Sequence, residues 1–433
     1  MSLFQFLLIN FAFLQTLAFA AEESHPVREE AIVVLSKSGT KRLEADKFLS
    51  ELPCKTIVVC MGEKEDIQLF SKNDKLIVCE VPEYVSSQGP ELALLQLTKS
   101  YNIVGLCANT ETDITRAAFL REYFNIPGQD ANSAFAFRNK IRMKEILSKN
   151  NVRVPRFIRA HTIFDVIKFS SENPFPLIMK PVDEAGAKDV TLLKNAEDIK
   201  KLAFKKEIFF SNNPGWDLEE FIEGTMFHID GLTQNNKVLV AWPSQYVNQC
   251  MECVSGKFTG SYMLSPDDSR VSPILEYTQQ VIRSLPDTKG SAFHLEIFQK
   301  NSGEIVFCEI GSRVGGGFIR LDWQKCFGLD LLEQHFALQA GLPATKYQQF
   351  PTDQTGFVLM YSKGGKVKEV KDISESEDLL FLDTWLRPGD IVENPASLSD
   401  TIGLVAFRIK HSNNPINEVE KWAQRLKESI IIE

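Results

Sequence analysis

Four short apolar runs near the N-terminal end of the chain constrain its fold more than any other feature. They are separated by polar stretches long enough to form helices, a pattern typical of a parallel sheet covered by helices. The first run leads into Ser36–Gly39 without a G-x-G-x-x-G motif, so no dinucleotide site is expected there. The pattern predicts a parallel α/β domain over residues 29–130. The runs are Ala31–Leu35, Thr56–Met61, Lys75–Cys79 and Ile103–Cys107.

The rest of the chain mixes helical and strand patterns. A central domain is expected over residues 131–342, and short strands with a last helix predict a small α+β unit over residues 350–433. The expected helices are Ala134–Asn150, Ser272–Leu285, Cys326–Leu342 and Ile416–Glu428, and the expected strands are Phe175–Pro181, Asp217–Ile222, Phe227–Leu232 and Lys237–Pro243.

Composition indicates an ordinary globular protein and excludes some functions. Of the 433 residues, 44% are hydrophobic and 24% are charged, as in typical soluble domains. The net charge of −9 argues against a nucleic-acid partner. Several of the eight cysteines lie inside apolar runs, and the pair Cys250 and Cys253 has no second pair at zinc spacing. This cysteine usage is typical of a reducing compartment, which suits the cytoplasm.

The first 20 residues point to a different compartment. Phe4–Ala20 is almost wholly apolar, and Ala18-Phe19-Ala20 resembles a signal-peptidase site, although no Lys or Arg precedes it. A cleaved leader, a hydrophobic anchor and a start codon placed too far upstream are the three alternatives. No later segment is expected to cross a membrane.

The segment from His294 to Arg313 predicts a β-hairpin that carries two glutamates. Two apolar runs flank the turn Asn301-Ser302-Gly303. With Ser302 and Gly303 at the tip, Glu296 lies directly across from Glu309 on the same face. Opposed Cβ atoms are roughly 4.5–5.5 Å apart, and two such carboxylates repel each other unless a cation lies between them. The pair therefore predicts a Mg²⁺ site, although a one-residue change in register would separate the two side chains.

Other polar residues point to a phosphate ligand near this hairpin. Arg313 and Gly315-Gly316-Gly317 follow it directly, so a fixed cation and a glycine turn lie next to the metal pair. Lys140 begins a predicted helix, and Lys180 ends a predicted strand, from which a compact charge can reach a nucleotide phosphate. Each lysine taken alone is also consistent with an ordinary surface position.

Taken together, these segments resemble the ATP-grasp superfamily, and within it the carboxylate–amine ligases, such as L-amino-acid ligases, carnosine synthase and biotin-carboxylase-like enzymes. The resemblance covers roughly residues 30–430. It implies an ATP-grasp fold with an N-terminal pre-ATP-grasp domain. The order of segments is Lys140, Lys180 with the small-residue loop Glu184–Val190, the strand Glu219–Gly224, Glu296, and Glu309–Arg313 with the glycines.

The resemblance also implies a role for each residue. Lys140 and Lys180 would bind the α- and β-phosphates of ATP, while Glu219 and the backbone N–H of Ile222 would bind adenine. Glu296 and Glu309 would hold Mg²⁺, or Mn²⁺ in its place. Arg313 would be the catalytic residue that stabilises the γ-phosphate and an acyl phosphate.

Three positions depart from the family pattern. Gly311 stands where an Asn is usual as a further metal ligand, so one or two metals remain open. Met226 replaces the acid that binds ribose; His228 and Asp230 share a strand face and either substitute for it or form a structural pair. Asp189 lies in the loop where glycine is common, and Lys188 could offset its charge.

The expected function is an ATP- and Mg²⁺-dependent ligase that joins a carboxylate to an amine through an acyl phosphate, with an amino acid on at least one side. A biotin-carboxylase-like component and a non-catalytic ATP-binding module are the alternatives. The expected partners are ATP and small molecules, and a homodimer is left open.

Overall fold

The computed structural model describes residues 28–433 apart from 38–45, 65, 205–208, 210–213, 346 and 411–413. The proposed leader, residues 1–20, lies outside the described residues. No helix in the described part of the chain is both long enough and apolar enough to span a membrane.

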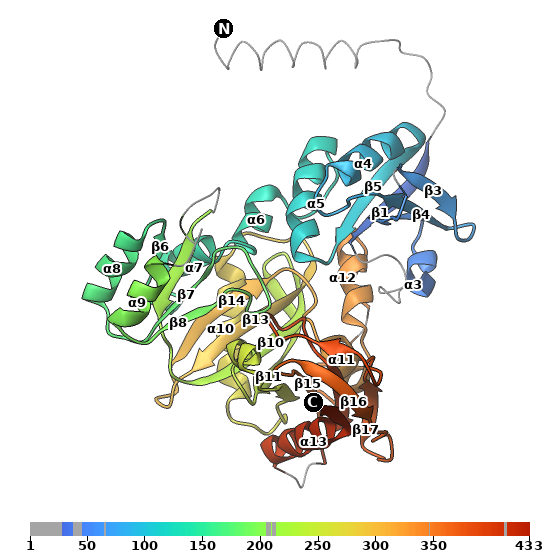
Figure 1. Ribbon diagram of the computed structural model, residues 1–433. Helices are drawn as coiled ribbons and strands as arrows, with labels where there is room; N and C mark the ends of the chain where they lie inside the picture. The colour runs from blue at the N-terminus through green and yellow to red at the C-terminus, as the bar shows by residue number, and fades with distance from the viewer. Residues whose placement is uncertain are drawn as a thin grey trace.

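The N-terminal part is the expected α/β layer structure (Figure 1). Its five-stranded sheet has the order β3-β4-β2-β1-β5, in which β3 alone is antiparallel to its neighbour. Alternate residues of β1 enter different hydrophobic clusters, Val34 in one and Val33 in the other, because both faces of a parallel sheet are covered. The elements are β1 (Glu29–Ser36), α3 (Asp46–Glu51), β2 (Lys55–Met61), β3 (Gln68–Ser71), β4 (Leu76–Val81), α4 (Gly89–Ser100), β5 (Tyr101–Ala108) and α5 (Glu111–Phe124).

A smaller lobe follows, built on an antiparallel four-stranded sheet of order β6-β9-β7-β8. The prediction of a single helix over Ala134–Asn150 is wrong, because this segment forms two helices. Asn139 has an extended backbone and caps the second helix by accepting the Arg142 N–H at 3.1 Å. The elements are α6 (Ala131–Ala136), α7 (Lys140–Lys149), β6 (Phe157–Ala160), α8 (Ile163–Glu172), β7 (Leu177–Pro181), β8 (Thr191–Leu193), α9 (Ala196–Ala203) and β9 (Trp216–Glu220).

The largest sheet has eight antiparallel strands in the order β14-β13-β10-β11-β12-β15-β19-β17. Its last three strands come from the C-terminal region, so the sheet continues across the boundary expected between residues 342 and 350. The strands of this sheet and the helices between them are β10 (Thr225–Gln234), β11 (Lys237–Tyr246), η1 (Cys250–Ser255), β12 (Thr259–Met263), α10 (Val271–Ser284), β13 (Ser291–Gln299), β14 (Ile305–Gly311), α11 (Ile319–Phe327), α12 (Leu331–Gln339), β15 (Thr355–Met360), β17 (Leu379–Asp383) and β19 (Gly403–Arg408).

The C-terminal region also forms a three-stranded sheet of its own, β18-β16-β20, and the expected last helix. The elements are β16 (Gly365–Val370), β18 (Ile391–Val392), α13 (Pro415–Ser429) and β20 (Ile430–Ile432).

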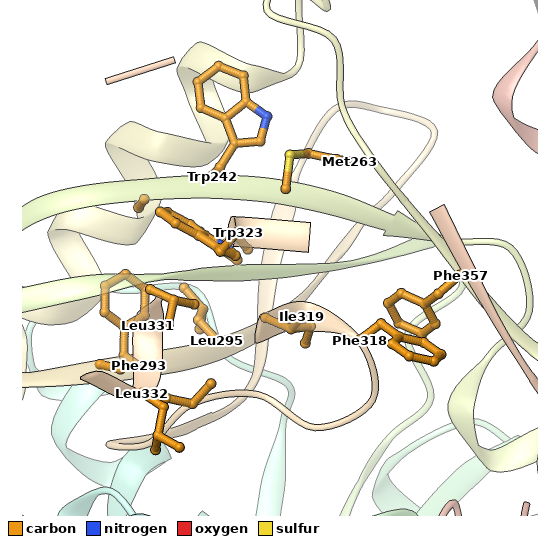
Figure 2. Packing of buried hydrophobic residues seen from close by; sticks show 14 of the residues in the cluster. Trp242, Met263, Phe293, Leu295, Phe318, Ile319, Trp323, Leu331, Leu332 and Phe357 are labelled. Carbon is orange, nitrogen blue, oxygen red and sulfur yellow. The ribbon is translucent and has the colours of Figure 1, made fainter. Parts of the chain in front are cut away.

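Helix α12 joins the N-terminal sheet to the central one. The helix expected over Cys326–Leu342 is wrong in its start, because Gly328 ends α11 with a φ of +62° and Asp330 caps α12. On one side of α12, His335 contacts the Ala108 carbonyl at the end of β5. On the other, Leu331 and Leu332 pack with Phe293 and Leu295 of β13 in the hydrophobic core (Figure 2). This packing sets the alternation in β13, whose intervening residues face away from the core.

Candidate active site

The hairpin of β13 and β14 places Glu296 directly opposite Glu309, as the sequence predicts. The hairpin differs from the expected one in its turn and in its strand register. The turn is a three-residue loop, Asn301–Gly303, in which Gly303 has a φ of +87° and donates to the Lys300 carbonyl at 2.8 Å. A bulge next to Glu296 then inserts Cys308 as an extra residue on β14. Each deviation shifts the register by one residue, and the two shifts cancel at the glutamate pair.

One cavity of about 1190 Å³ is lined by all seven candidate site residues. The structure therefore brings together side chains from β7, β9, β13, β14 and the start of α7. The role of each residue remains a prediction. The seven are Lys140, Lys180, Glu219, Ile222, Glu296, Glu309 and Arg313.

Buried charges at one end of this cavity form a network of ion pairs. The Lys180 Nζ lies 2.7 Å from the Glu219 carboxylate, and Lys144, fully buried, contacts both Glu219 and Asp217. Burial alone would raise the pKa of Glu219, but Lys144 and Lys180 outweigh it and lower that pKa. Glu219 is thus an ionised acceptor whose oxygens are shared with two lysines, and an adenine amine would have to share them as well.

Glu309 is held by Lys140, whose Nζ lies 3.1 Å from its carboxylate. Burial would raise the pKa of Glu309, but the charges of Lys140 and Lys180 lower it to about 2. Glu296 accepts a hydrogen bond from the Tyr246 hydroxyl at 3.1 Å. Glu309 is therefore ionised and directly opposite a second carboxylate, a donor set of hard oxygens that fits Mg²⁺.

Arg313 faces the N-terminal domain as well as the hairpin. Its guanidinium forms an ion pair with Glu111, the first residue of α5, and Arg138 lies 3.3 Å from the same carboxylate. Burial would raise the pKa of Glu111, but Arg313 and Arg138 lower it. The Val314 N–H donates to the Asn109 side chain at 3.0 Å. Sequence reasoning missed Glu111 and Arg138, because no local pattern connects the start of α5 with a hairpin about 200 residues away.

The glycines after the hairpin have different structural roles. A Cβ on Gly315 would lie 2.7 Å from Asp230 and 2.8 Å from His294, so this position allows a close approach of the loop to the sheet. Gly317 has a φ of +65°, in the left-handed region. Gly316 has open space around it.

His228 and Asp230 form a structural pair behind the cavity and do not line it, so the alternative that they replace the ribose-binding acid is not supported. Both residues are 1% exposed, and the His228 Nδ1 lies 2.6 Å from the Asp230 carboxylate. The other oxygen of Asp230 lies 2.8 Å from the Nδ1 of His294. Burial would lower the pKa of His294, but Asp230 and Glu296 raise it to about 10.

The small-residue loop also lines the cavity. Residues 184–188 and Val190 contribute to the lining and Asp189 does not, so its charge is not directed at the ligand space. Lys188 lies 3.2 Å from Glu184. The Gly186 carbonyl accepts from the Leu398 N–H at 3.0 Å, which connects this loop to the C-terminal region.

Comparison with known proteins identifies the central domain of this chain. Residues 137–317 match the family model of the ATP-grasp domain. This match and the fold together confirm the resemblance to ATP-grasp proteins for this part of the chain.

Similar proteins point within the superfamily to ligases. The chain is 27% identical over 326 residues to the L-arginine-specific L-amino acid ligase of Bacillus subtilis. The alignment covers 74% of this chain and 78% of the relative. The crystal structure of an L-amino acid ligase from Bacillus licheniformis superposes with a TM-score of 0.71 at 17% identity, covering 94% of this chain and 100% of that one.

A carboxylase shares the fold at a greater distance. The biotin carboxylase domain of the 2-oxoglutarate carboxylase of Hydrogenobacter thermophilus, a dimer in complex with MgADP and bicarbonate, gives a TM-score of 0.65 at 12% identity, with 94% and 91% of the two chains covered. At these identities the two structural similarities show the fold alone.

Proposed function

We propose that this chain is an ADP-forming ligase that joins a carboxylate to an amine with ATP and Mg²⁺, with an amino acid on at least one side. The observation that carries the proposal is the convergence of two lysines, two opposed glutamates and one arginine on a single cavity. Amino acids are the substrate class because an L-amino acid ligase aligns with three quarters of the chain.

The residues divide into those that bind ATP and one that acts on the transferred group. Lys140 and Lys180 would bind the α- and β-phosphates, and Glu219 with the Ile222 backbone would bind adenine. Glu296 and Glu309 would hold Mg²⁺, which when bound neutralises phosphate charge and orients the phosphate oxygens. Arg313 would bind the γ-phosphate and then the acyl phosphate.

The reaction requires two transfers in the cavity. A carboxylate oxygen attacks the γ-phosphorus and ADP leaves, which gives an acyl phosphate. An amine nitrogen then attacks the acyl carbon, inorganic phosphate leaves, the nitrogen loses a proton and an amide forms. Since phosphoryl transfer depends on positioning and charge neutralisation, the fixed cations Lys140, Lys180 and Arg313 supply what the first step needs.

Two alternatives make different demands on the same cavity. A biotin-carboxylase-like component would release phosphate with bicarbonate and no amine. A non-catalytic module would bind ATP without releasing phosphate, and a binding module gains nothing from an arginine placed for the transferred group.

The test is a screen of amino-acid pairs with the full chain, ATP and Mg²⁺, measured by phosphate release and by mass spectrometry of the product. We expect phosphate release that requires both amino acids and a product whose mass is that of the pair less one water. Glu309→Gln is the matched inactive control. Phosphate release with bicarbonate alone, or ATP binding without turnover in any pair, would overturn the proposal. A homodimer remains a separate prediction, which the oligomeric state in solution would test.

A further inference from the structure

Two neighbouring rungs of the central sheet carry the polar side chains of the metal site. In the first, His228 of β10 pairs with Glu296 of β13, which pairs with Glu309 of β14. In the second, Asp230 pairs with His294, which pairs with Gly311. Because residues two apart on a strand share a face, both rungs point to the same side of the sheet, away from the core residues Phe293 and Leu295.

The second rung lacks a side chain at its β14 end. Gly311 offers no ligand atom, and it stands next to the glutamate pair. The residue directly across from it is His294, which lines the cavity and is 8% exposed. An imidazole therefore stands beside the position where β14 has nothing to contribute.

Hydrogen bonds fix the His294 ring so that its second nitrogen lies near Glu296. Its Nδ1 donates to Asp230 at 2.8 Å, and Asp230 is held in turn by His228 at 2.6 Å. The His228 Nε2 lies 2.7 Å from the Ser261 hydroxyl, which completes the support. The remaining nitrogen of His294, Nε2, lies 3.6 Å from the Glu296 carboxylate. A carboxylate on Nδ1 with Nε2 directed outward is the arrangement that orients histidine ligands in metal sites.

We propose that the Nε2 of His294 is a third protein ligand of the cation held by Glu296 and Glu309, and that the site therefore prefers Mn²⁺ to Mg²⁺. This inference rests on the proposed function, because that function supplies the cation. Two ligands of one octahedral ion lie roughly 3 Å apart when each is about 2.1 Å from the metal, so a small shift from 3.6 Å is enough. Imidazole nitrogen favours transition-metal ions over Mg²⁺, which binds oxygen almost exclusively.

The same three residues, His228, Asp230 and His294, lie close enough to enclose a cation of their own. Asp230 instead accepts a hydrogen bond from each ring, so the cluster acts as the support for His294.

The test reads the ligand directly, by electron spin-echo spectroscopy of Mn²⁺ bound to the full chain without nucleotide. We expect modulation from a ¹⁴N nucleus, which changes to that of ¹⁵N when the histidines alone are labelled. In His294→Gln the nitrogen modulation should vanish and Mn²⁺ affinity should fall at least about tenfold. His161→Ala, at an exposed histidine elsewhere, is the matched control and should retain both.

A second variant separates ligation from mere support of the fold. A Cβ at Gly311 would meet its nearest neighbours, Arg313 and Glu111, at 3.4 Å, an ordinary contact, so a substitution there causes no clash at Cβ. Adding Gly311→Asn to His294→Ala should restore cation affinity through an amide oxygen, without nitrogen modulation and with preference for Mg²⁺ over Mn²⁺.

The outcomes separate this inference from the proposed function. Wild-type protein that binds Mn²⁺ without histidine nitrogen modulation, while its amino-acid ligation persists, overturns the ligand assignment alone. A preference for Mg²⁺ that is the same in wild type and His294→Gln also overturns it. Absence of ATP-dependent ligation with either metal overturns the proposed function.

Discussion

Glu296 and Glu309 pair directly across β13 and β14, although the residue pairs nearer the hairpin tip are shifted by one position relative to them. The three-residue loop displaces the pairing by one position, and the bulge at Cys308 restores it. The result places two carboxylates side by side at the floor of a cavity that Lys140 and Lys180 also line. A metal pair that depends on a bulge is sensitive to local insertions or deletions in β14.

Glu309→Gln should abolish ATP turnover and leave the fold intact. The substitution is nearly isosteric, but it removes the negative charge that Lys140 and a metal ion share. Phosphate release and the thermal unfolding midpoint measure the two halves of this prediction. Full activity with unchanged Mg²⁺ dependence would refute the metal assignment.

Arg313→Lys should lower turnover by roughly 10²–10³, the usual loss for one preorganised charge donor. A lysine is a point charge and cannot bind a phosphoryl group bidentately while also meeting Glu111. ATP affinity should change little, because Arg313 is proposed to stabilise the transferred phosphoryl group and the acyl phosphate rather than bound ATP.

Lys180→Ala should show the opposite order of effects and weaken ATP binding first. It removes a proposed phosphate ligand and leaves Glu219 paired with Lys144. Nucleotide affinity and single-turnover phosphate release on both variants test the division. If Arg313→Lys loses ATP binding as severely as Lys180→Ala, the separation of binding from catalytic roles is wrong.

Gly315→Ala should destabilise the loop and weaken metal binding together. The new Cβ would lie 2.4 Å from Ile319 and under 3.0 Å from Asp230 and His294. Either the loop or the hydrogen bond between His294 and Asp230 therefore has to move. A cost of about 1–3 kcal/mol is usual for such overpacking. Gly316→Ala is the control, since nothing lies within 4 Å of its Cβ position. Equal unfolding midpoints for the two variants would contradict the close-approach role.

The stability of the protein should fall below pH 6.5 in part because of His335. Burial lowers the pKa of this histidine to about 4 from its ordinary value of 6.5. The unfolded chain therefore binds a proton in this window that the folded chain does not, so stability rises with pH between about 4 and 6.5 and is level above it. The full effect is on the order of 3 kcal/mol at 1.36 kcal/mol per pKa unit.

The variant His335→Gln tests this dependence. Glutamine cannot gain the proton, so the fall in the urea midpoint between pH 8 and pH 5 should be smaller than in wild type. Because His335 connects Ala108 of β5 with Ala292 of β13, hydrogen exchange should show that this junction opens first on acidification. An identical pH dependence in both proteins would rule out His335 as a cause.

The parts of this protein that local sequence determines are several of its strands and helices and the chemistry of its candidate site. The β-branched apolar run Ala31–Leu35 forms a strand whose side chains are buried on both faces of the sheet. The lysines, glutamates and arginine that line the cavity were predicted from their order along the chain. Helix ends were predicted less well, because a single capping side chain such as Asn139 or Asp330 decides them.

Only the tertiary structure decides which of these residues face one another. A sequence pattern cannot set the register of β13 against β14, because the loop and the bulge each contribute one residue of shift and their sum depends on the packing of the whole sheet. Contacts such as Arg313 with Glu111, and His294 with Asp230, join segments that are 202 and 64 residues apart. The sequence alone determined which chemical groups are available. The tertiary structure buried Phe293 and Leu295 on one face of β13 and thereby placed His294 and Glu296 on the other. That placement brings the groups together as a site.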